Sequence, residues 1–110
     1  TSVDVVIGDR YEASCPAEIT SFVEDLLRAQ GLRVVRNKPY AGGFITQNYG
    51  SPTLGRNALQ IEINRGLYLD EQRFEKTADF QPLQAALAGT IKTLLETLVE
   101  FANPQKQAAE

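Results

Sequence analysis

The chain has 110 residues, of which 43% are hydrophobic and 23% charged, and its formal net charge is −3. This length bounds it to one domain, and the composition is typical of a globular fold rather than of a disordered segment or a transmembrane helix. The sequence contains no histidine and one cysteine, Cys15. This chain alone therefore cannot build a Ser-His-Asp triad, a histidine-containing zinc site or an internal disulfide. A single cysteine is also typical of a reducing compartment, and we expect a cytoplasmic location and no membrane partner.

A strand, a helix and a second strand are predicted within the first 35 residues. β-Branched residues at 3–7 predict a strand buried on both faces, as in parallel sheets. Pro16 and Glu18 mark the first turn of a helix, and Gly31 is placed to follow its C-terminus. Residues 32–35 predict the second strand, which a right-handed crossover joins to the first. The apolar face of the helix consists of Ile19, Phe22, Val23, Leu26 and Leu27.

The rest of the chain is predicted to hold a long connection, a third strand and a long helix. The connection at 36–57 is rich in glycine and proline, and long structured connections are often functional. Strict alternation predicts a strand at 58–64, and residues 66–77 are predicted to be irregular. Asp79 is placed to cap a helix over 80–101. The core stripe of this helix consists of Leu83, Ala86, Leu87, Thr90, Ile91, Leu94, Leu95, Leu98 and Val99.

Charge is distributed unevenly along the sequence. Residues 1–25 carry six acids and one base, residues 26–69 carry six bases and one acid, and residues 70–110 carry seven acids and four bases. A basic middle predicts an anion site or an acidic partner. Nucleic acid is disfavoured as that partner, because the whole chain is acidic and no basic stripe alternates with aromatic residues. We therefore expect a small anionic substrate.

The alternating strand at 58–64 contains the one carboxylate of the basic middle, Glu62. Its odd-numbered positions are apolar, and positions 60, 62 and 64 are polar. In an antiparallel edge strand the polar row would face water, whereas in a sheet covered on both faces it must meet polar partners or open into a cleft. Basic surroundings keep a carboxylate ionised, as suits a general base. Two interpretations stay open for Glu62: a catalytic base, or an ion-pair partner of Arg65 or Arg36.

The loop at 36–50 supplies further candidates for a ligand site. Its Pro-Tyr-Ala-Gly-Gly run at 39–43 allows the backbone to approach a ligand closely, although the same residues can simply make a turn. Arg36 and Arg65 are candidates for a bidentate grip on a carboxylate, or they are solvated surface arginines. With Glu62 as the catalytic residue and no metal ligand, the predicted substrate-binding residues are Arg36, Asn37, Tyr40, Gly42, Gly43, Asn64 and Arg65.

Three blocks of the sequence together resemble the N-formylglutamate amidohydrolase (deformylase) family. They are DVVIGDR at 4–10, RNKPYAGGFIT at 36–46 and ALQIEINRGLYLDE at 58–71, of which the third is the most specific. The resemblance covers roughly residues 4–101. It implies an α/β fold that forms part of a three-layer α/β/α sandwich, similar to zinc carboxypeptidases (phosphorylase/hydrolase-like), with a mixed, mostly parallel sheet. Residues 1–110 would be the C-terminal portion of a single catalytic domain whose upstream portion is absent.

The resemblance also implies a reaction, the hydrolysis of the formyl amide of N-formyl-L-glutamate to formate and L-glutamate in histidine degradation. In zinc carboxypeptidase-like enzymes a zinc-bound water attacks the carbonyl and a glutamate on a strand transfers its proton; Glu62 matches that glutamate. The zinc ligands of the family include histidines, so in this protein we expect them upstream of Thr1. On its own, this chain is then expected to be inactive and metal-free, and able to self-associate through an exposed edge or apolar face.

Two alternatives remain open from the sequence. The first is a related zinc amidohydrolase or carboxypeptidase that acts on another acyl-glutamate, with Glu62 in the same role. The second is a non-catalytic α/β module that binds an acidic ligand. Turnover of N-formylglutamate, compared with its N-acetyl and N-succinyl analogues, distinguishes them.

Overall fold

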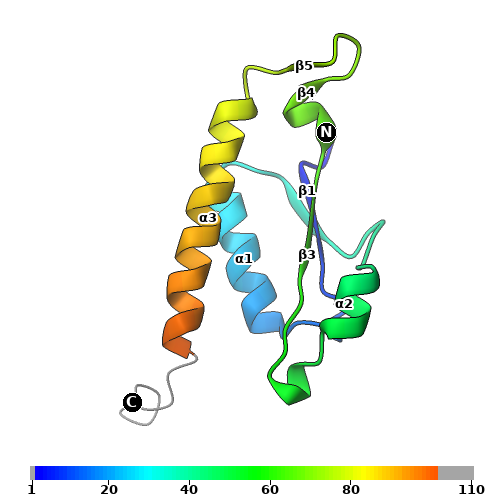
Figure 1. Ribbon diagram of the computed structural model, residues 1–110, viewed down its shortest axis with the longest axis vertical. Coiled ribbons are helices and arrows are strands. Elements are labelled where there is room, and N and C mark those ends of the chain that lie inside the picture. Colours follow the sequence, from blue (N-terminus) through cyan, green and yellow to red (C-terminus); the bar gives the residue numbers. More distant parts are fainter. Residues whose placement is uncertain (1, 102–110) are drawn as a thin grey trace.

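The computed structural model describes residues 2–101, which contain three α-helices, five strands and two short 3-10 helices (Figure 1). No helix among these residues combines the length and apolar character that crossing a membrane requires. In chain order the elements are β1 (Val5–Gly8), α1 (Ala17–Ala29), β2 (Val34–Arg36), α2 (Phe44–Tyr49), the 3-10 helix Pro52–Leu54, β3 (Gln60–Ile63), the 3-10 helix Arg65–Leu67, β4 (Leu69–Asp70), β5 (Glu75–Lys76) and α3 (Phe80–Phe101).

The predicted strand–helix–strand unit is confirmed. β1 and β2 are parallel neighbours, and α1 connects them. Pro16 precedes the first helical turn in an extended conformation, Glu18 lies in that turn, and Gly31 follows the helix at a φ of 85°. A positive φ at this position favours glycine, which is why the helix ends where the sequence predicts.

The main sheet is mixed, with the strand order β2-β1-β3. β1 is parallel to β2 and antiparallel to β3, and β4 pairs with β5 in a second, antiparallel sheet. The expectation of a mostly parallel sheet is therefore not confirmed for the described residues. The connection from β2 to β3 stays at the end of the sheet where β1 and β2 finish, so β3 runs back beside β1 (Figure 1). A parallel strand would instead need a crossover to the opposite end.

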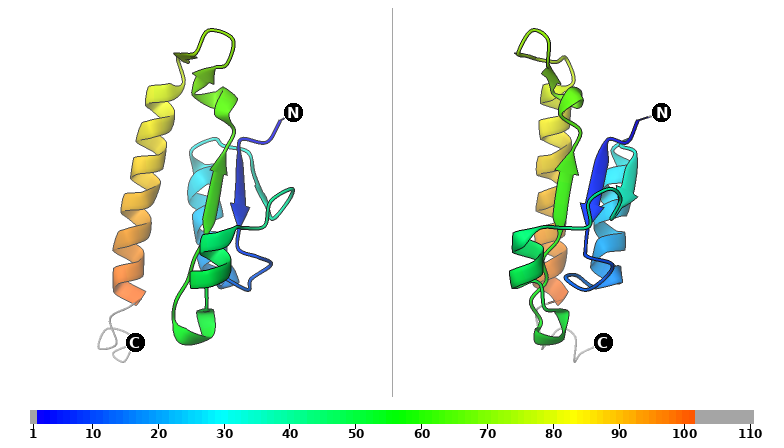
Figure 2. Two further views of the ribbon diagram at one scale, coloured as in Figure 1. Left: turned by 45° about the vertical axis from the view of Figure 1, so that its right-hand side comes forward. Right: turned by 90° about the vertical axis from the view of Figure 1, so that its right-hand side faces the viewer.

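Both long helices cover the same face of this sheet (Figure 2). The core consists of Val5 and Ile7 of β1, Val23 and Leu27 of α1, and Val34 of β2. Leu87 and Leu94 of α3 pack against this cluster. Among the described residues the opposite face has no long helix on it, so they show two layers of the expected three-layer sandwich. We refer to this uncovered side as the open face.

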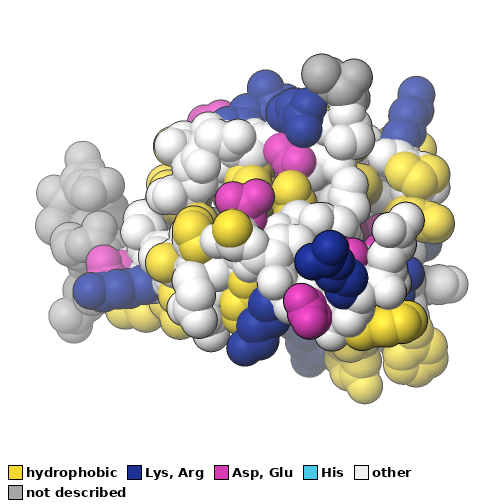
Figure 3. Space-filling model, turned by 90° about the horizontal axis from the view of Figure 1, so that it is seen from above, with side chains coloured by type: hydrophobic (Ala, Val, Ile, Leu, Met, Phe, Trp, Pro, Cys, Tyr) yellow, Lys and Arg dark blue, Asp and Glu magenta, His cyan; other side chains and the backbone are white. Residues whose placement is uncertain are grey.

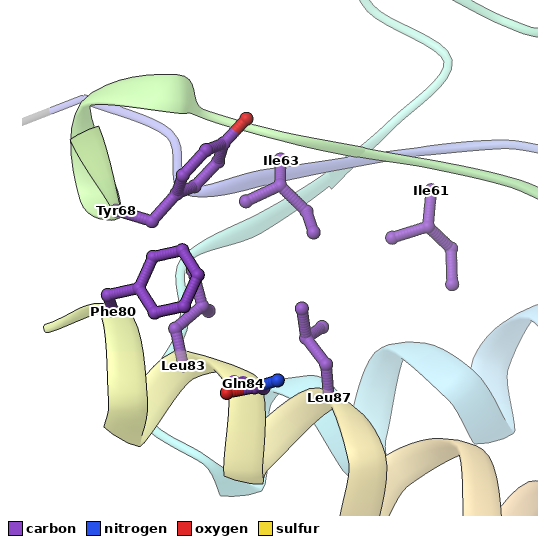
Figure 4. A pocket seen from close by; sticks show the side chains of 7 residues that line it. All are labelled: Ile61, Ile63, Tyr68, Phe80, Leu83, Gln84 and Leu87. Carbon is purple, nitrogen blue, oxygen red and sulfur yellow. The ribbon is translucent and has the colours of Figure 1, made fainter. Parts of the chain in front are cut away.

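The predicted alternation of β3 is confirmed. Ile61 and Ile63 point toward α3, where they line a cavity of about 410 Å³ together with residues of the following segment (Figure 4). In that cavity the rings of Tyr68 and Phe80 meet edge to face, with their centroids 6.2 Å apart. Because side chains alternate along a strand, Glu62 lies on the open face.

Two segments without predicted regular structure contain short elements. The connection 36–57 includes α2, whose first turn is closed by a 2.8 Å hydrogen bond from the Gly43 N–H to Thr46 Oγ1. The segment 66–77 includes the hairpin of β4 and β5. Elements of two to six residues show no hydrophobic period, so the sequence pattern does not reveal them.

We expect Ile7→Ala to lower the free energy of unfolding by about 2–5 kcal/mol, because the side chain is fully buried at the centre of the core. Ile91→Ala removes the same atoms from a side chain on α3 that is 54% exposed, and should change stability by about 0.5 kcal/mol or less. Urea denaturation of the two variants measures both effects. Equal losses would contradict the placement of the core between the sheet and the two helices.

Candidate functional site

Polar side chains meet where the parallel strands β1 and β2 end. Asp9 follows β1, and Asn37 follows β2; both are buried, at 1% and 8% exposure. The Asp9 N–H donates to Asn37 Oδ1 at 3.1 Å, and Asn37 Nδ2 donates to Asp9 Oδ1 at 2.8 Å. Asn37 has a φ of 61°, which asparagine tolerates better than most residues. The side chain of Asn37, predicted to bind substrate, is thus used to join the two strand ends.

The Asp9 carboxylate accepts two more hydrogen bonds. Thr20 Oγ1 on α1 donates to Oδ2 at 2.9 Å, and the N–H of Glu12 donates to Oδ1 at 3.1 Å. Burial raises the pKa of the Asp9 carboxyl. The hydrogen bonds that the carboxylate accepts, together with the positive charge of Arg36, more than offset this, and the pKa lies below its ordinary value. Asp9 is therefore a buried, ionised group that fixes β1, β2 and α1 to one another.

The turn after Asp9 has an unusual backbone. Arg10, Tyr11 and Glu12 have φ values of 51°, 54° and 73°, so three consecutive non-glycine residues are left-handed. Each such residue costs about 1–2 kcal/mol, and strain of this kind persists where surrounding contacts impose it. Here the hydrogen bond from Glu12 to the Asp9 carboxylate contributes one such contact. The turn brings Arg10 against residues 39–43, which we call the glycine-rich loop.

The glycine-rich loop lies directly on the end of β1. The Arg10 N–H donates to the carbonyl oxygen of Ala41 at 2.8 Å, and a Cβ atom on Gly8 would lie 2.6 Å from that oxygen. Gly42 has a φ of 152°, and a Cβ atom there would overlap Thr46 Oγ1. Such close approaches require glycine at both positions. In the described residues the loop backbone approaches the protein's own strand, and its predicted approach to a ligand stays a prediction.

Glu62 lies on the open face of the sheet, near the glycine-rich loop. It pairs with Val6 in the β1–β3 ladder and is partly buried. Gln60 Nε2 donates to Glu62 Oε1 at 3.1 Å. The other amide atom, Gln60 Oε1, would lie 3.3 Å from a Cβ atom built on Gly43. One side chain therefore separates the Glu62 carboxylate from the glycine-rich loop.

The structure does not bring Arg36 and Arg65 to Glu62. Arg36 lies at the end of β2 on the helix-covered face, where Nε donates to Glu24 Oε2 at 2.9 Å and Nη2 donates to Ser21 Oγ at 2.9 Å. Arg65 is exposed, and its Nε donates to Glu71 Oε1 at 2.9 Å. The ion pair of Glu62 with either arginine is therefore a wrong interpretation for the described residues. Both guanidinium groups are instead paired with carboxylates of the chain itself, Glu24 and Glu71.

The remaining predicted residues divide between the loop and the far end of β3. Tyr40 is 57% exposed on the glycine-rich loop. Asn64 caps the following 3-10 helix, since its Oδ1 accepts from the Gly66 N–H at 3.0 Å, and its Nδ2 donates to the Val3 carbonyl oxygen at 3.1 Å. Of the predicted residues, the structure thus brings Glu62, through Gln60, next to Gly43 of the glycine-rich loop, and Asn37 lies between the end of β2 and that loop.

The predicted basic middle does not form one patch. Basic and acidic side chains are interspersed on the face that Figure 3 shows. Four of the six bases pair with acids from the acidic parts of the sequence. These pairs are Arg28–Glu24, Arg36–Glu24, Arg33–Asp4 and Arg65–Glu71.

The side chains of the described segment do not fit a zinc site. Among residues 2–101 no group of three or more His, Cys, Asp or Glu side chains could hold a metal ion, and the sequence has no histidine. Cys15 is buried, and burial raises the pKa of its thiol, which disfavours the thiolate that a metal requires. The donor set for the implied zinc is thus not present in these residues.

Comparison with known proteins gives consistent matches. The family model described as N-formylglutamate amidohydrolase matches residues 1–69. N-formylglutamate deformylase of Pseudomonas aeruginosa is 35% identical over 100 residues, which are 89% of this chain and 36% of the relative. The Pseudomonas putida enzyme of the same name is 31% identical over 96 residues, 86% of this chain and 32% of the relative. The crystal structure of an N-formylglutamate amidohydrolase from Ralstonia eutropha JMP134 superposes with a TM-score of 0.79 at 38% identity, over 86% of this chain and 34% of that one. The chain spans about a third of the length of these relatives.

We expect Asp9→Asn to lower the free energy of unfolding by about 2–4 kcal/mol at pH 7, because the amide replaces an ionised acceptor of three hydrogen bonds. Since the pKa of Asp9 is lowered in the folded state, its contribution is complete above the unfolded pKa of about 4 and is lost as pH falls through the folded pKa. The difference between the variant and the original protein should therefore shrink below about pH 4. Urea denaturation across pH measures this, with Asp25→Asn on the exposed side of α1 as the control. A pH-independent difference would contradict the assignment.

Gly42→Ala tests the packing of the glycine-rich loop. The positive φ and the contact with Thr46 should together cost about 1–3 kcal/mol of stability. Gly89→Ala makes the same chemical change in α3, where nothing lies within 4 Å of the added atom, and should stabilise by about 0.5–1 kcal/mol. Thermal unfolding of both variants should show a loss of stability for Gly42→Ala and a gain for Gly89→Ala. Stability changes of the same sign would contradict the loop geometry.

Proposed function

The chain belongs to the N-formylglutamate amidohydrolase family, and from this premise we propose that it supplies the proton-transferring glutamate of an enzyme that hydrolyses N-formyl-L-glutamate to formate and L-glutamate. The names of its relatives support this reaction. Because the chain corresponds to about a third of their length, the activity is assigned to the whole enzyme that contains it.

The position of Glu62 is the observation that carries the proposal. It is the one acid in the basic middle of the sequence, it lies on the open face of the sheet, and its hydrogen-bond partner Gln60 adjoins Gly43 in the glycine-rich loop. A substrate on the open face next to this loop would therefore lie within reach of a carboxylate. The hydrogen-bond partner of Glu62 is a neutral amide rather than a cation.

Hydrolysis of a formyl amide requires a proton to move twice. The attacking water loses a proton as its oxygen bonds to the formyl carbon, and the nitrogen gains one as the C–N bond breaks. Glu62 can accept the first proton and deliver it to the leaving amine, so that formate and the free amino group of glutamate result. Proton transfer by a positioned group contributes about 10²–10⁴-fold to such rates.

The zinc that the resemblance implies is assigned to ligands outside this chain, because the described residues lack a suitable donor set. Neither the proton transfer proposed for Glu62 nor the substrate binding proposed beside the glycine-rich loop makes these residues metal ligands. The same proposal includes a small anionic substrate, a place in histidine degradation and a cytoplasmic location. The single cysteine of the chain supports that location.

Glu62→Gln in the full-length enzyme tests this proposal. The substitution keeps the shape of the side chain and its contact with Gln60 but removes the proton acceptor, so kcat for formate release from N-formyl-L-glutamate should fall by about 10²–10⁴-fold or more. Glu96→Gln on the exposed side of α3 is the matched control and should leave kcat unchanged. Turnover of the Glu62 variant close to that of the original enzyme would remove Glu62 from the reaction.

The acyl group is tested with the unaltered enzyme. Faster turnover of N-formyl-L-glutamate than of its N-acetyl and N-succinyl analogues supports a deformylase. Preference for either analogue indicates an amidohydrolase of another acyl-glutamate, and binding of these ligands without turnover indicates a non-catalytic module.

A further inference from the structure

A hollow of about 290 Å³ lies where the end of β1 meets the glycine-rich loop. Its lining comes from two segments that are distant in the sequence, the left-handed turn after β1 and the loop with the start of α2. The lining residues are Arg10, Tyr11, Ala41, Gly42, Gly43 and Gln47. Arg10 is the one charged residue among them.

Arg10 differs from the arginines that the sequence predicts to bind substrate. Arg36 and Arg65 each pair with a carboxylate, and so do Arg28 and Arg33. Within residues 2–101 no ion pair joins Arg10 to an acid. The nearest acid in the sequence, Asp9, is buried and already accepts three hydrogen bonds from other groups. The charge of Arg10 is therefore available to a ligand.

The base of the Arg10 side chain is held in place. Its N–H is bonded to the Ala41 carbonyl oxygen at 2.8 Å, and its Cγ would lie 2.9 Å from a Cβ atom on Gly42. The strained turn that presents Arg10 is stabilised by the buried Asp9. Pre-ordering a side chain in this way reduces the entropy that ligand binding would otherwise cost.

The same loop connects this hollow with Glu62. Gly43 lines the hollow, and Gln60 lies between Gly43 and the Glu62 carboxylate. A ligand that spans the glycine-rich loop can thus meet a cation at one end and the proton-transferring carboxylate at the other.

We propose that Arg10 binds one carboxylate of the dicarboxylate substrate and is a specificity-determining residue of this site. The identity of the ligand rests on the proposed function. A guanidinium group matches a carboxylate with two parallel hydrogen bonds, which an amide in the same position cannot accept equally. Arg10 therefore discriminates a glutamate derivative from one whose corresponding carboxylate is amidated.

The test compares three substrates with the full-length enzyme: N-formyl-L-glutamate, N-formyl-L-glutamine and N-formyl-L-isoglutamine. Arg10→Asn removes the guanidinium while asparagine tolerates the left-handed backbone. KM for N-formyl-L-glutamate should rise about 10–100-fold, as expected for the loss of a charge-assisted contact, with a smaller change in kcat. For one of the two amides the same substitution should change KM about twofold or less, because the interacting partner is already absent. Arg73→Asn, an exposed arginine in the turn between β4 and β5, is the matched control and should leave all three KM values unchanged.

An unchanged KM for N-formyl-L-glutamate, or an equal rise for all three substrates, would overturn the proposal. Calorimetry with L-glutamate, L-glutamine and L-isoglutamine separates it from the proposed function, because binding needs no turnover. Weaker binding of L-glutamate by the Arg10 variant than by the unaltered enzyme supports the carboxylate contact even if formate is never released. Equal binding by the two proteins overturns the contact, and so does the absence of binding by the unaltered enzyme. Should Arg10→Asn fail to fold, NMR titration of the unaltered enzyme decides. The Arg10 Nε–H signal should shift with L-glutamate and with only one of the two amides, and a signal that does not move rejects the contact.

Discussion

The reciprocal contact between Asp9 and Asn37 is the constraint on which the candidate site depends. It joins the ends of β1 and β2, and through Thr20 it also fixes α1 to the same point. A buried carboxylate is costly to desolvate, and here the hydrogen bonds that it accepts compensate for that cost. Because both residues stand at the start of irregular segments, this one contact sets the course of the left-handed turn and of the glycine-rich loop. The end of the sheet where β1 and β2 finish is therefore ordered by the buried polar pair Asp9 and Asn37 rather than by apolar packing.

The two faces of the sheet explain why the bases that surround Glu62 in the sequence do not surround it in the structure. Residues alternate between faces, so Arg36 of β2 points to the helices while Glu62 of β3 points away from them. On the helix side Arg36 meets Glu24 of α1, an acid from the first part of the sequence. Counting bases near an acid along the chain thus overstates how many of them lie near it in space. Two charged residues of the sheet can interact only when the alternation of side chains places them on the same face.

Local patterns predicted most of the fold, and long-range contacts account for what they missed. The strand–helix–strand unit, the alternation of β3 and the bounds of α3 all follow from periodicity and from turn signals near each element. The antiparallel direction of β3 depends on the path of the long connection between β2 and β3, which no local sequence pattern predicts. Of the site, the position of Glu62 on the polar side of its strand was predictable. Arg10 was not singled out as a site residue, although a charged residue shortly after a buried parallel strand is a signal for the ligand-binding end of an α/β sheet.

No ion pair joins Arg10 to Glu62 among the described residues, and the roles proposed for the two groups give a chemical reason to keep them apart. An arginine in direct contact with a carboxylate stabilises its ionised form and so disfavours the uptake of a proton. A site that must both bind an anion and transfer a proton therefore benefits from keeping its cation and its carboxylate apart. In this chain the glycine-rich loop and the neutral amide of Gln60 stand between the two groups. A side chain on Gly42 would contact Arg10 and Thr46, so glycine at this position keeps the space beside Arg10 open.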